Sequence, residues 1–450
     1  MYEAEGESDL TLGGTLMVLT LAVDPNFQGR GIGSQLLNAI AKHVKQFSCQ
    51  RIALTCLADL IAFYERNIKI WAKPLQLMRM KLGIETSLLG FGCMRFPTLP
   101  DGKIDEAEAE RMLDRAIAAG VNYIDTAYPY HNGQSEPLVG KVLKKYDRDS
   151  FYLATKLPLW AVNSVEDAER IFNEQLERLQ TDHIDFYLLH AVNKEKWNQM
   201  KELGVVDYCA KLKEEGKIRY YGFSFHDDYE VFEEILHYRQ WDFCQIQYNY
   251  LDRNEQAGDK GYALAESLGV PLVIMEPVKG GSLAGFSEDI NERFHKMDPE
   301  ASVASYALRW VGSHPNVKVI LSGMSTMQQV EDNLKTFENF KPLSEAESKE
   351  IDEIVKELRS RVQNGCTGCR YCMPCPAGVN IPGNFKVWNN YHMYRTYGHV
   401  QRAWEVDLKE EEKAKNCVKC GKCETLCPQK LSIRADLVRV QQELDDRIFK

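Results

Sequence analysis

The amino-acid sequence predicts an α/β protein whose central part is a (β/α)8 barrel. Eight short apolar runs, typical of buried strands, alternate with amphipathic stretches whose apolar residues recur at helical spacing. This alternation extends over residues 82–340, and its length and rhythm are those of such a barrel. A doubly wound parallel sheet is the alternative. It would normally open with a Gly-x-Gly-x-x-Gly turn, and none follows the first apolar run.

The strands and helices of the barrel can be placed in order along the chain. The apolar runs predict eight strands, at residues 88–94, 123–127, 151–156, 184–190, 218–225, 243–249, 271–277 and 317–323. The clearest helical stretches between them are residues 105–119, 164–179 and 301–311. Each strand is thus followed by a segment able to return the chain to the start of the next strand.

Length and composition set the domain organisation and exclude some functions. A chain of 450 residues is long for one ordinary domain, and we expect three segments, at residues 1–77, 78–343 and 344–450. The net charge of −10 argues against nucleic acid as the main partner, because phosphate contacts need a basic surface. The apolar stretches are too short to cross a membrane, and acidic residues precede the first of them. We therefore expect a cytoplasmic protein without a membrane or nucleic-acid partner.

Eight of the thirteen cysteines lie in two short runs near the C-terminus. They are Cys366, Cys369, Cys372, Cys375, Cys417, Cys420, Cys423 and Cys427. Thiols three residues apart, in runs that end in Cys-Pro, can surround a [4Fe–4S] cube. Structural zinc sites more often use two separated Cys-x-x-Cys pairs, and no feature indicates the oxidising compartment that a disulfide framework needs. The runs therefore predict an iron–sulfur domain at the C-terminus.

The number of clusters depends on how the two runs combine. The fourth cysteine of such a run often binds a second cluster, so two clusters would have crossed ligand sets. One set would be Cys366, Cys369, Cys372 and Cys427, and the other Cys375, Cys417, Cys420 and Cys423. The first run is one residue short before its last cysteine, which leaves a single cluster as the alternative.

Four polar residues lie at or just after the ends of the predicted strands, where barrel enzymes have their active site. They are Asp125, Tyr130, Lys156 and His190. A lysine cation lowers the pKa of a neighbouring tyrosine and makes proton donation feasible, while an aspartate can hold the lysine. A histidine can orient a substrate carbonyl. Each residue alone has an ordinary structural explanation, but the convergence of all four at one mouth predicts a catalytic site.

Residues 78–340 resemble the aldo-keto reductase family. The first strand of the family is matched by Leu88-Leu-Gly-Phe-Gly-Cys-Met-Arg-Phe-Pro97. Its catalytic residues are matched by Asp125-Thr-Ala-x-x-Tyr130, Thr155-Lys156 and Leu-Leu-His190. Its cofactor segments are matched by Gly222-Phe-Ser-Phe225 and Gln245-Ile-Gln-Tyr-Asn249. It implies reduction of a small aldehyde or ketone by hydride transfer from NADPH or NADH. Tyr130 would be the proton donor, Lys156 and Asp125 would tune it, and His190 would position the carbonyl.

The same resemblance implies where the nicotinamide cofactor binds. Ser224 and Gln245 would hold the carboxamide, and the loop after the last strand, from Gly323 to Asn333, would carry the adenosine end. This loop has glutamines but no cation for the 2′-phosphate of NADP, so we expect no strong selectivity for NADPH. Phe225 and Met275 also depart from the family's pattern, standing where many members have Asn and a stacking tyrosine.

Residues 15–70 resemble part of a GNAT-type N-acetyltransferase. They read as strand, Gly-rich turn, helix, strand and helix, and Gln28-Gly-Arg-Gly-Ile-Gly33 resembles the family's pyrophosphate loop. Tyr64 lies at the family's proton-donor position. The first strands and the acceptor-binding part of that family have no counterpart, so we expect a fused remnant rather than a working acetyltransferase.

Hydride transfer needs no iron, so the clusters require a separate explanation. They could exchange single electrons with a redox partner protein, or they could have a structural role and hold the cysteine domain to the barrel. The functional alternative to a reductase is an electron-transfer or binding protein whose barrel has lost turnover. The complete set of four residues favours the reductase.

Overall fold

The computed structural model describes residues 15–18, 51–54, 77–79, 83–338, 340–396 and 398–448. The chain divides into two units, Met1–Pro74 and Leu75–Lys450. In the first unit, β1 (Thr15–Val18) pairs in parallel with β2 (Arg51–Leu54). Both strands lie within runs that the sequence predicts as strands. The Gly-rich turn, the two helices and Tyr64 of the predicted acetyltransferase-like segment lie outside the described residues.

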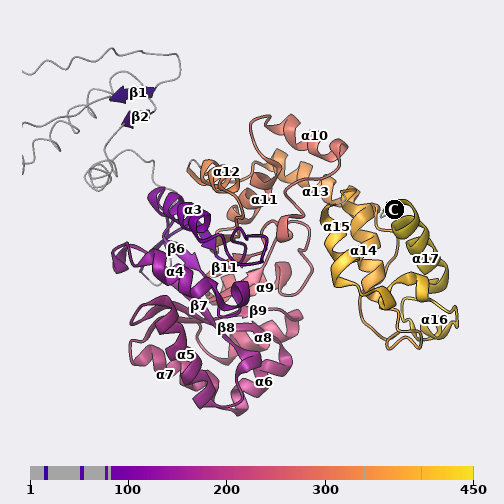
Figure 1. The fold of residues 1–450 in the computed structure, drawn as a ribbon, viewed down its shortest axis with the longest axis horizontal. Coiled ribbons are helices and arrows are strands. Elements are labelled where there is room, and N and C mark those ends of the chain that lie inside the picture. Colours follow the sequence, from indigo (N-terminus) through magenta and orange to yellow (C-terminus); the bar gives the residue numbers. More distant parts are fainter. Residues whose placement is uncertain are drawn as a thin grey trace, which may run out of the picture. The chain divides into compact units, whose positions relative to one another are not determined.

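Eight parallel strands close into a barrel in the second unit (Figure 1). They are β5 (Leu89–Gly92), β6 (Tyr123–Asp125), β7 (Tyr152–Pro158), β8 (Ile184–Val192), β9 (Ile218–Phe225), β10 (Phe243–Gln247), β11 (Leu272–Met275) and β12 (Val317–Ser322). Each strand pairs with its neighbours in chain order, and β12 closes the ring against β5. All eight predicted strands are present, so the (β/α)8 barrel is confirmed. An antiparallel hairpin of β3 (Leu77–Arg79) and β4 (Glu85–Ser87), which we did not predict, precedes it.

Helices follow the strands and cover the outside of the barrel. They are α3 (Glu106–Ala118), α4 (Ser135–Leu143), α5 (Val165–Leu179), α6 (Lys194–Glu202), α7 (Val205–Glu214), α8 (Tyr229–Tyr238), α9 (Gly258–Leu268), α10 (Glu288–Met297), α11 (Val303–Gly312) and α12 (Met327–Glu338). α5 shows why such a segment is helical. The side chain of Ser164 caps its first turn by accepting a hydrogen bond from the Asp167 amide, and Gln180 ends it in a left-handed conformation.

Aromatic side chains fill the interior of the barrel. The ring of Phe186 lies with its centroid 4.9 to 6.0 Å from the rings of Tyr123, Tyr152, Tyr220 and Phe243. A filled interior is usual for barrels of this size, which are packed cores rather than pores. A ligand can therefore enter only from an end of the barrel.

The C-terminal segment is mainly helical, as predicted, and has an apolar core of its own. After α13 (Glu345–Ser360) it contains α14 (Ile381–Tyr394), α15 (Gly398–Arg402), α16 (Lys422–Leu426) and α17 (Ile433–Val440). Phe385, Trp388 and Trp404 are buried in this second core. Tyr394 at the end of α14 packs instead with the barrel's core, its ring centroid 6.2 Å from that of Phe286. In the described part of the chain no helix is both long and apolar enough to cross a membrane.

Gly140 of α4 lies so close to the end of α5 that the fold requires a residue without a side chain there. A Cβ atom at this position would lie 2.5 Å from the carbonyl oxygen of Arg178 and 2.6 Å from the carbonyl carbon of Leu179. We predict that Gly140→Ala lowers the stability by about 1–3 kcal/mol, although alanine is the better helix former, because backbone atoms must move apart.

Thermal unfolding followed by circular dichroism checks this prediction. The matched control is Gly285→Ala, because a Cβ at Gly285 would meet no atom within 4 Å. An unchanged melting temperature for Gly140→Ala would contradict the close contact between α4 and α5.

Candidate active site and cysteine sites

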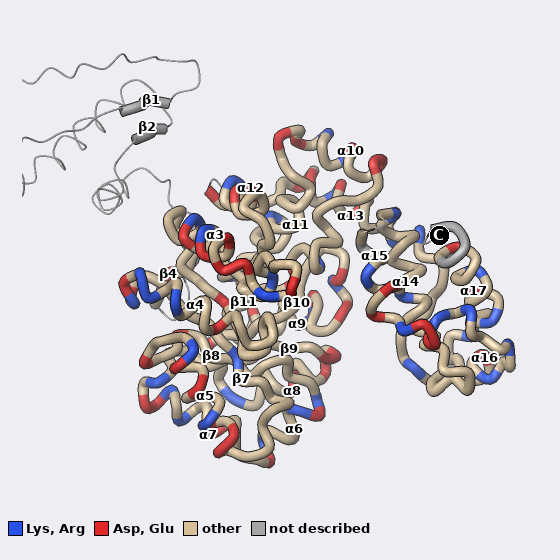
Figure 2. Tube along the Cα trace, in the orientation of Figure 1, with Lys and Arg blue, Asp and Glu red and all other residues tan. Residues whose placement is uncertain are grey.

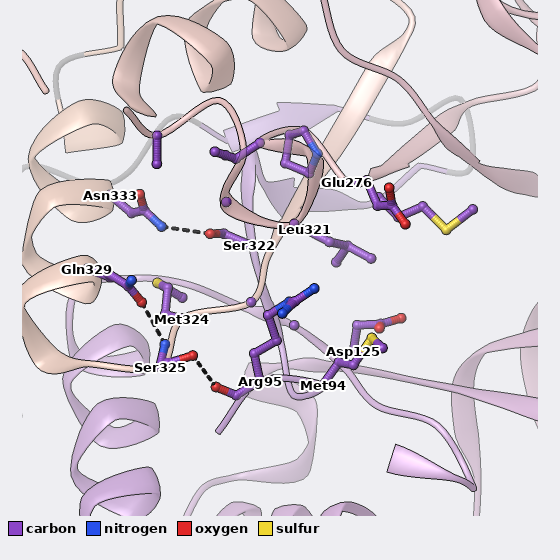
Figure 3. A pocket seen from close by; sticks show the side chains of 18 of the residues that line it. Met94, Arg95, Asp125, Glu276, Leu321, Ser322, Met324, Ser325, Gln329 and Asn333 are labelled. Carbon is purple, nitrogen blue, oxygen red and sulfur yellow. Dashed lines mark hydrogen bonds between the residues drawn. The ribbon is translucent and has the colours of Figure 1, made fainter. Parts of the chain in front are cut away.

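A pocket of about 410 Å³ opens at the C-terminal ends of the barrel strands. Seven of the eight predicted active-site and cofactor residues line it, namely Asp125, Tyr130, His190, Ser224, Gln245, Gly323 and Asn333. Figure 3 shows part of this pocket, with Asp125, Ser322 and Asn333 among its labelled residues. The eighth residue, Lys156, is completely buried. The closed barrel thus brings together residues that are as far apart in the sequence as Asp125 and Asn333.

Lys156 connects three groups of the site through its ammonium nitrogen. Nζ lies 2.7 and 2.9 Å from the two carboxylate oxygens of Asp125 and 2.7 Å from the carbonyl oxygen of Thr126. It also lies 3.3 Å from the hydroxyl oxygen of Tyr130. A buried charge is costly unless it is paired and hydrogen-bonded, and these contacts meet that need. The arrangement places a cation directly behind the Tyr130 hydroxyl.

Burial and the neighbouring charges set the protonation states of Lys156 and Tyr130. Burial acts to lower the pKa of Lys156, but Asp125 and Tyr130 together raise it, so the lysine stays charged. Burial raises the pKa of Tyr130 above its ordinary value of 10.0, and Lys156 opposes this without outweighing it. The sequence-based expectation of a lowered tyrosine pKa is therefore wrong for the net shift, although Lys156 acts in the expected direction. Tyr130 is a protonated phenol at neutral pH.

His190 is the second neutral group that faces the pocket. Burial, with smaller contributions from Lys156 and His226, lowers its pKa well below 6.5. Its ring stands nearly perpendicular to the Tyr130 ring, at 79° and a centroid distance of 6.1 Å. Within the described residues, Nδ1 of His190 is buried and has no hydrogen-bond partner. The site therefore offers a phenol and a neutral imidazole side by side.

A buried hydrogen-bond network supports Lys156 from behind, and its members were not predicted from the sequence. Gln175 of α5 donates through Nε2 to the carbonyl oxygen of Lys156 at 3.0 Å and to Glu136 Oε1 at 2.8 Å. Thr155 donates to the same carboxylate oxygen at 2.7 Å. Gln175 follows Ala168, Ile171 and Phe172 on the buried face of its helix, and a glutamine on such an apolar face was the available signal.

Two buried groups fit the carboxamide of a nicotinamide ring. Gln245 lines the pocket, and its Oε1 is buried without a partner in the described part of the chain, so it can accept a hydrogen bond from an amide. Among the described residues, its Nε2 meets the sulfur of Met275 alone, at 3.4 Å. Ser224 also lines the pocket, and its hydroxyl accepts a hydrogen bond from the Ala191 amide at 2.8 Å and donates to the Leu189 carbonyl oxygen at 3.5 Å. The two residues predicted to hold the carboxamide thus pair in register between neighbouring strands, and Gln245 has unused hydrogen-bonding capacity among the described residues.

The loop after β12 is joined to the loop after β5 by a contact that the sequence did not indicate. Ser325 donates from its hydroxyl to the Arg95 carbonyl oxygen at 2.7 Å, as Figure 3 shows. The Arg95 side chain passes over Gly323, where a Cβ would lie 3.3 Å from its stem, and its Nη2 reaches Gly280. Among the described residues that line the pocket, Arg95 is the only lysine or arginine. It supplies a cation that the loop after β12 lacks.

The eight clustered cysteines line two small pockets in the C-terminal segment. The first pocket is lined by Cys366, Cys369, Cys372 and Cys427, and the second by Cys372, Cys375, Cys417, Cys420 and Cys423. Cys372 touches both, and without it the first pocket would have only three cysteines. The grouping is that of the crossed pattern, with Ile381 at the start of α14 lining both pockets. At least four thiols line each pocket, which fits the ligand demand of a [4Fe–4S] cube, and the assignment of ligands to clusters stays a prediction.

Comparison with known protein families gives three matches along the chain. The model of the aldo/keto reductase family matches residues 88–356, which is more than half of the chain. The model of the acetyltransferase (GNAT) family matches residues 8–68, and that of the 4Fe-4S dicluster domain matches residues 365–431. All three resemblances recognised in the sequence are therefore confirmed.

Individual relatives cover the barrel and are similar to this chain at modest identity. The uncharacterized oxidoreductase YqkF of Bacillus subtilis is 27% identical over 313 residues, covering 62% of this chain and 97% of the relative. The NADH-specific methylglyoxal reductase of Escherichia coli is 26% identical over 341 residues, covering 65% and 99%. Among solved structures, the holo form of aldo-keto reductase AKR11C1 from Bacillus halodurans has 28% identity and a TM-score of 0.54, covering 62% of this chain and 96% of its own.

The protonation states predict a flat pH profile around neutrality. If Tyr130 donates a proton and His190 acts as a neutral group, kcat/KM for reduction should be constant between pH 6.5 and 10.0, the ordinary pKa values of the two side chains. The tyrosine pKa is raised, so activity should fall only as the pH rises above 10.0. Steady-state assays in buffers of constant ionic strength measure this profile. A rise or fall of kcat/KM between pH 6.5 and 8 would contradict the neutral histidine.

The two cysteine pockets predict the iron content of the protein. We expect about eight iron and eight sulfide ions per chain after anaerobic purification, because each pocket would hold one four-iron cube. Cys375→Ser should reduce both counts toward about four, since Cys375 lines the second pocket only. Cys244→Ser is the control, because Cys244 is a buried cysteine of the barrel. About four iron ions in the unaltered protein would contradict two clusters.

Proposed function

The chain belongs to the aldo/keto reductase family, and we propose that it reduces the carbonyl group of an aldehyde or ketone with NADPH or NADH. The observation that carries this proposal is the buried chain of contacts from Asp125 through Lys156 to Tyr130, at the pocket that His190 also faces. A protein whose barrel had lost turnover would have no need to keep a buried charge in this arrangement. A non-catalytic barrel is therefore the less favoured alternative.

Each residue of the site has its own role in carbonyl reduction. The dihydronicotinamide, when bound, supplies a hydride to the carbonyl carbon. Tyr130 donates its phenolic proton to the carbonyl oxygen, and the Lys156 ammonium, 3.3 Å from the Tyr130 oxygen, stabilises the phenolate that remains. Asp125 holds Lys156 in place, and the neutral His190 orients the carbonyl by a hydrogen bond. Both steps together convert the carbonyl group into an alcohol.

The pocket is suited to either nicotinamide nucleotide. Gln245 and Ser224 would bind the carboxamide, which NADH and NADPH share. The loop from Gly323 to Asn333 has no lysine or arginine for a 2′-phosphate, and the guanidinium of Arg95 is directed toward Gly280 rather than toward Gln329. A relative from Escherichia coli is described as NADH-specific, which supports use of NADH by a barrel of this kind.

The cysteine domain supports a second activity, the transfer of single electrons. Four cysteines line the first pocket and five the second, with Cys372 in both, and hydride transfer in the barrel uses none of them. We propose that the clusters exchange single electrons with a redox partner protein. A purely structural role is the alternative, in which the clusters only hold the C-terminal segment together.

The three segments have separate roles in this proposal. The barrel at residues 78–343 would carry the reductase, and residues 344–450 the linker helix and the clusters. Residues 1–77 would be a remnant of an acetyltransferase, since the family match covers residues 8–68 only. We propose a cytoplasmic location, where the reduced nucleotide and a reducing environment for the thiols are both available.

Tyr130→Phe tests the proposed function. Loss of the phenolic proton should lower kcat by about 10²–10⁴-fold, because a positioned proton donor contributes that much to the rate. The measurement is oxidation of NADPH and of NADH with a panel of aldehydes and ketones, methylglyoxal included. Tyr128→Phe is the matched control, because Tyr128 donates to Glu174 at 2.9 Å and does not line the pocket. Equal rates for Tyr130→Phe and the unaltered protein would contradict the proposal.

A further inference from the structure

The segments that carry the clustered cysteines are basic, although the chain as a whole is acidic. Residues 366–378 and 415–434 contain six lysines and arginines and one carboxylate, whereas the whole chain has a net charge of −10. Figure 2 shows blue stretches beside the label α16, where the second run lies, and beside α17, which follows it. These two segments therefore carry more cations than carboxylates, against the balance of the whole chain.

Four of these cations are not used to hold the fold together. Lys415 pairs with Glu410, and Arg434 pairs with Glu424 at 2.8 Å. The other four are exposed, and none of them forms an ion pair within the described part of the chain. They are Arg370, Lys419, Lys422 and Lys430. Arg370 lines the first cysteine pocket and Lys419 the second, while Lys419 and Lys430 border one shallow depression of the surface.

The backbone at three of these cations would favour glycine. Arg370, Lys419 and Lys430 have φ angles of 63°, 57° and 51°, which lie in the left-handed region that L-residues with side chains rarely adopt. Gly421, between two of the cysteines, has a φ of 80° and shows the residue that this backbone normally selects. Glycine at these positions would fit the backbone and remove the charge. All three residues are exposed.

Exposed apolar residues and two exposed cysteines lie among these cations. Tyr371, Val418 and Leu426 expose 68%, 67% and 46% of their surface. Cys369 and Cys420 are the exposed members of the two cysteine groups. Large apolar side chains among charged residues are typical of protein–protein interfaces, and exposed ligands bring a cluster close to whatever docks there. We call the four cations and three apolar residues the basic cysteine face.

We propose that the basic cysteine face is the docking site for an acidic one-electron carrier protein. The inference rests on the proposed electron-transfer role of the clusters and adds the chemistry of the partner and the residues that recognise it. One electron leaves the reduced cofactor of the carrier and enters a cluster, and no bond or proton moves. Opposite charge on the carrier would steer the encounter and orient the two redox groups toward each other.

Binding of an acidic flavodoxin to the anaerobically purified full chain tests this proposal. Both proteins are kept oxidised, so calorimetry measures association without any turnover. The variant is Arg370→Gly/Lys419→Gly/Lys430→Gly, which removes three charges and gives the backbone the residue that it favours. We expect a loss of affinity of about tenfold or more at low salt, and weaker binding of the unaltered protein as salt screens the charges. Iron content and melting temperature should not fall.

A matched control removes the same charge at positions outside the basic cysteine face. Lys144, Lys341 and Lys349 are exposed, and the variant Lys144→Gln/Lys341→Gln/Lys349→Gln should bind flavodoxin as the unaltered protein does. A basic cytochrome c should not bind to the basic cysteine face.

Three outcomes would overturn the proposal. They are equal flavodoxin affinity for the glycine variant and the unaltered protein, binding that does not weaken with salt, and salt-dependent association of the chain with a second copy of itself at this face. Because carbonyl reduction is not measured, failure of this test leaves the Tyr130 chemistry untouched, and failure of the Tyr130 test leaves docking untouched.

Discussion

The fully buried ammonium group of Lys156 is the constraint on which the barrel's site depends. A charge removed from water must be paired and hydrogen-bonded, and loss of one of its partners lowers the stability of the fold by several kcal/mol. The partners of Lys156 come from β6 and the turn that follows it, so the pairing of Asp125 with Ala154 between β6 and β7 must keep its register. On the other side, Gln175 of α5 holds the Lys156 carbonyl. A change in any of these elements would disturb the fold and the site together.

Burial also decides which groups of the site carry charge. It lowers the pKa of His190 and raises that of Tyr130, so both face the pocket as neutral hydrogen-bond donors. The one cation of this set lies behind Tyr130, where it stabilises the phenolate without meeting the substrate. A neutral carbonyl can therefore enter the pocket without first displacing an ion pair. The Lys156 cation stabilises the phenolate that forms once Tyr130 has given up its proton.

The sequence predicts those features of this protein that depend on local pattern and on closure of a parallel barrel. The eight strands follow from apolar runs, and the meeting of Asp125, Tyr130, Lys156 and His190 follows from the rule that parallel strands end at one mouth. The raised pKa of Tyr130 was not predicted, because it depends on how deeply the hydroxyl is buried. The contact of Arg95 with Gly323 was also missed, since it joins loops at opposite ends of the barrel sequence. The cysteines that line the two pockets include the two sets expected from the crossing, with Cys372 in both, and the ligand sets stay a prediction.

Two kinds of electron chemistry are proposed for one chain, and they can be separated by following the hydrogen that reaches the product. The measurement is reduction of an accepted aldehyde with NADPH or NADH that carries deuterium at both C4 positions of the dihydronicotinamide, with mass spectrometry of the alcohol. Direct hydride transfer in the barrel predicts one deuterium on the carbinol carbon of every product molecule. Product with solvent hydrogen on that carbon, formed while the nucleotide is oxidised, would show that the electrons travel singly and would contradict the account.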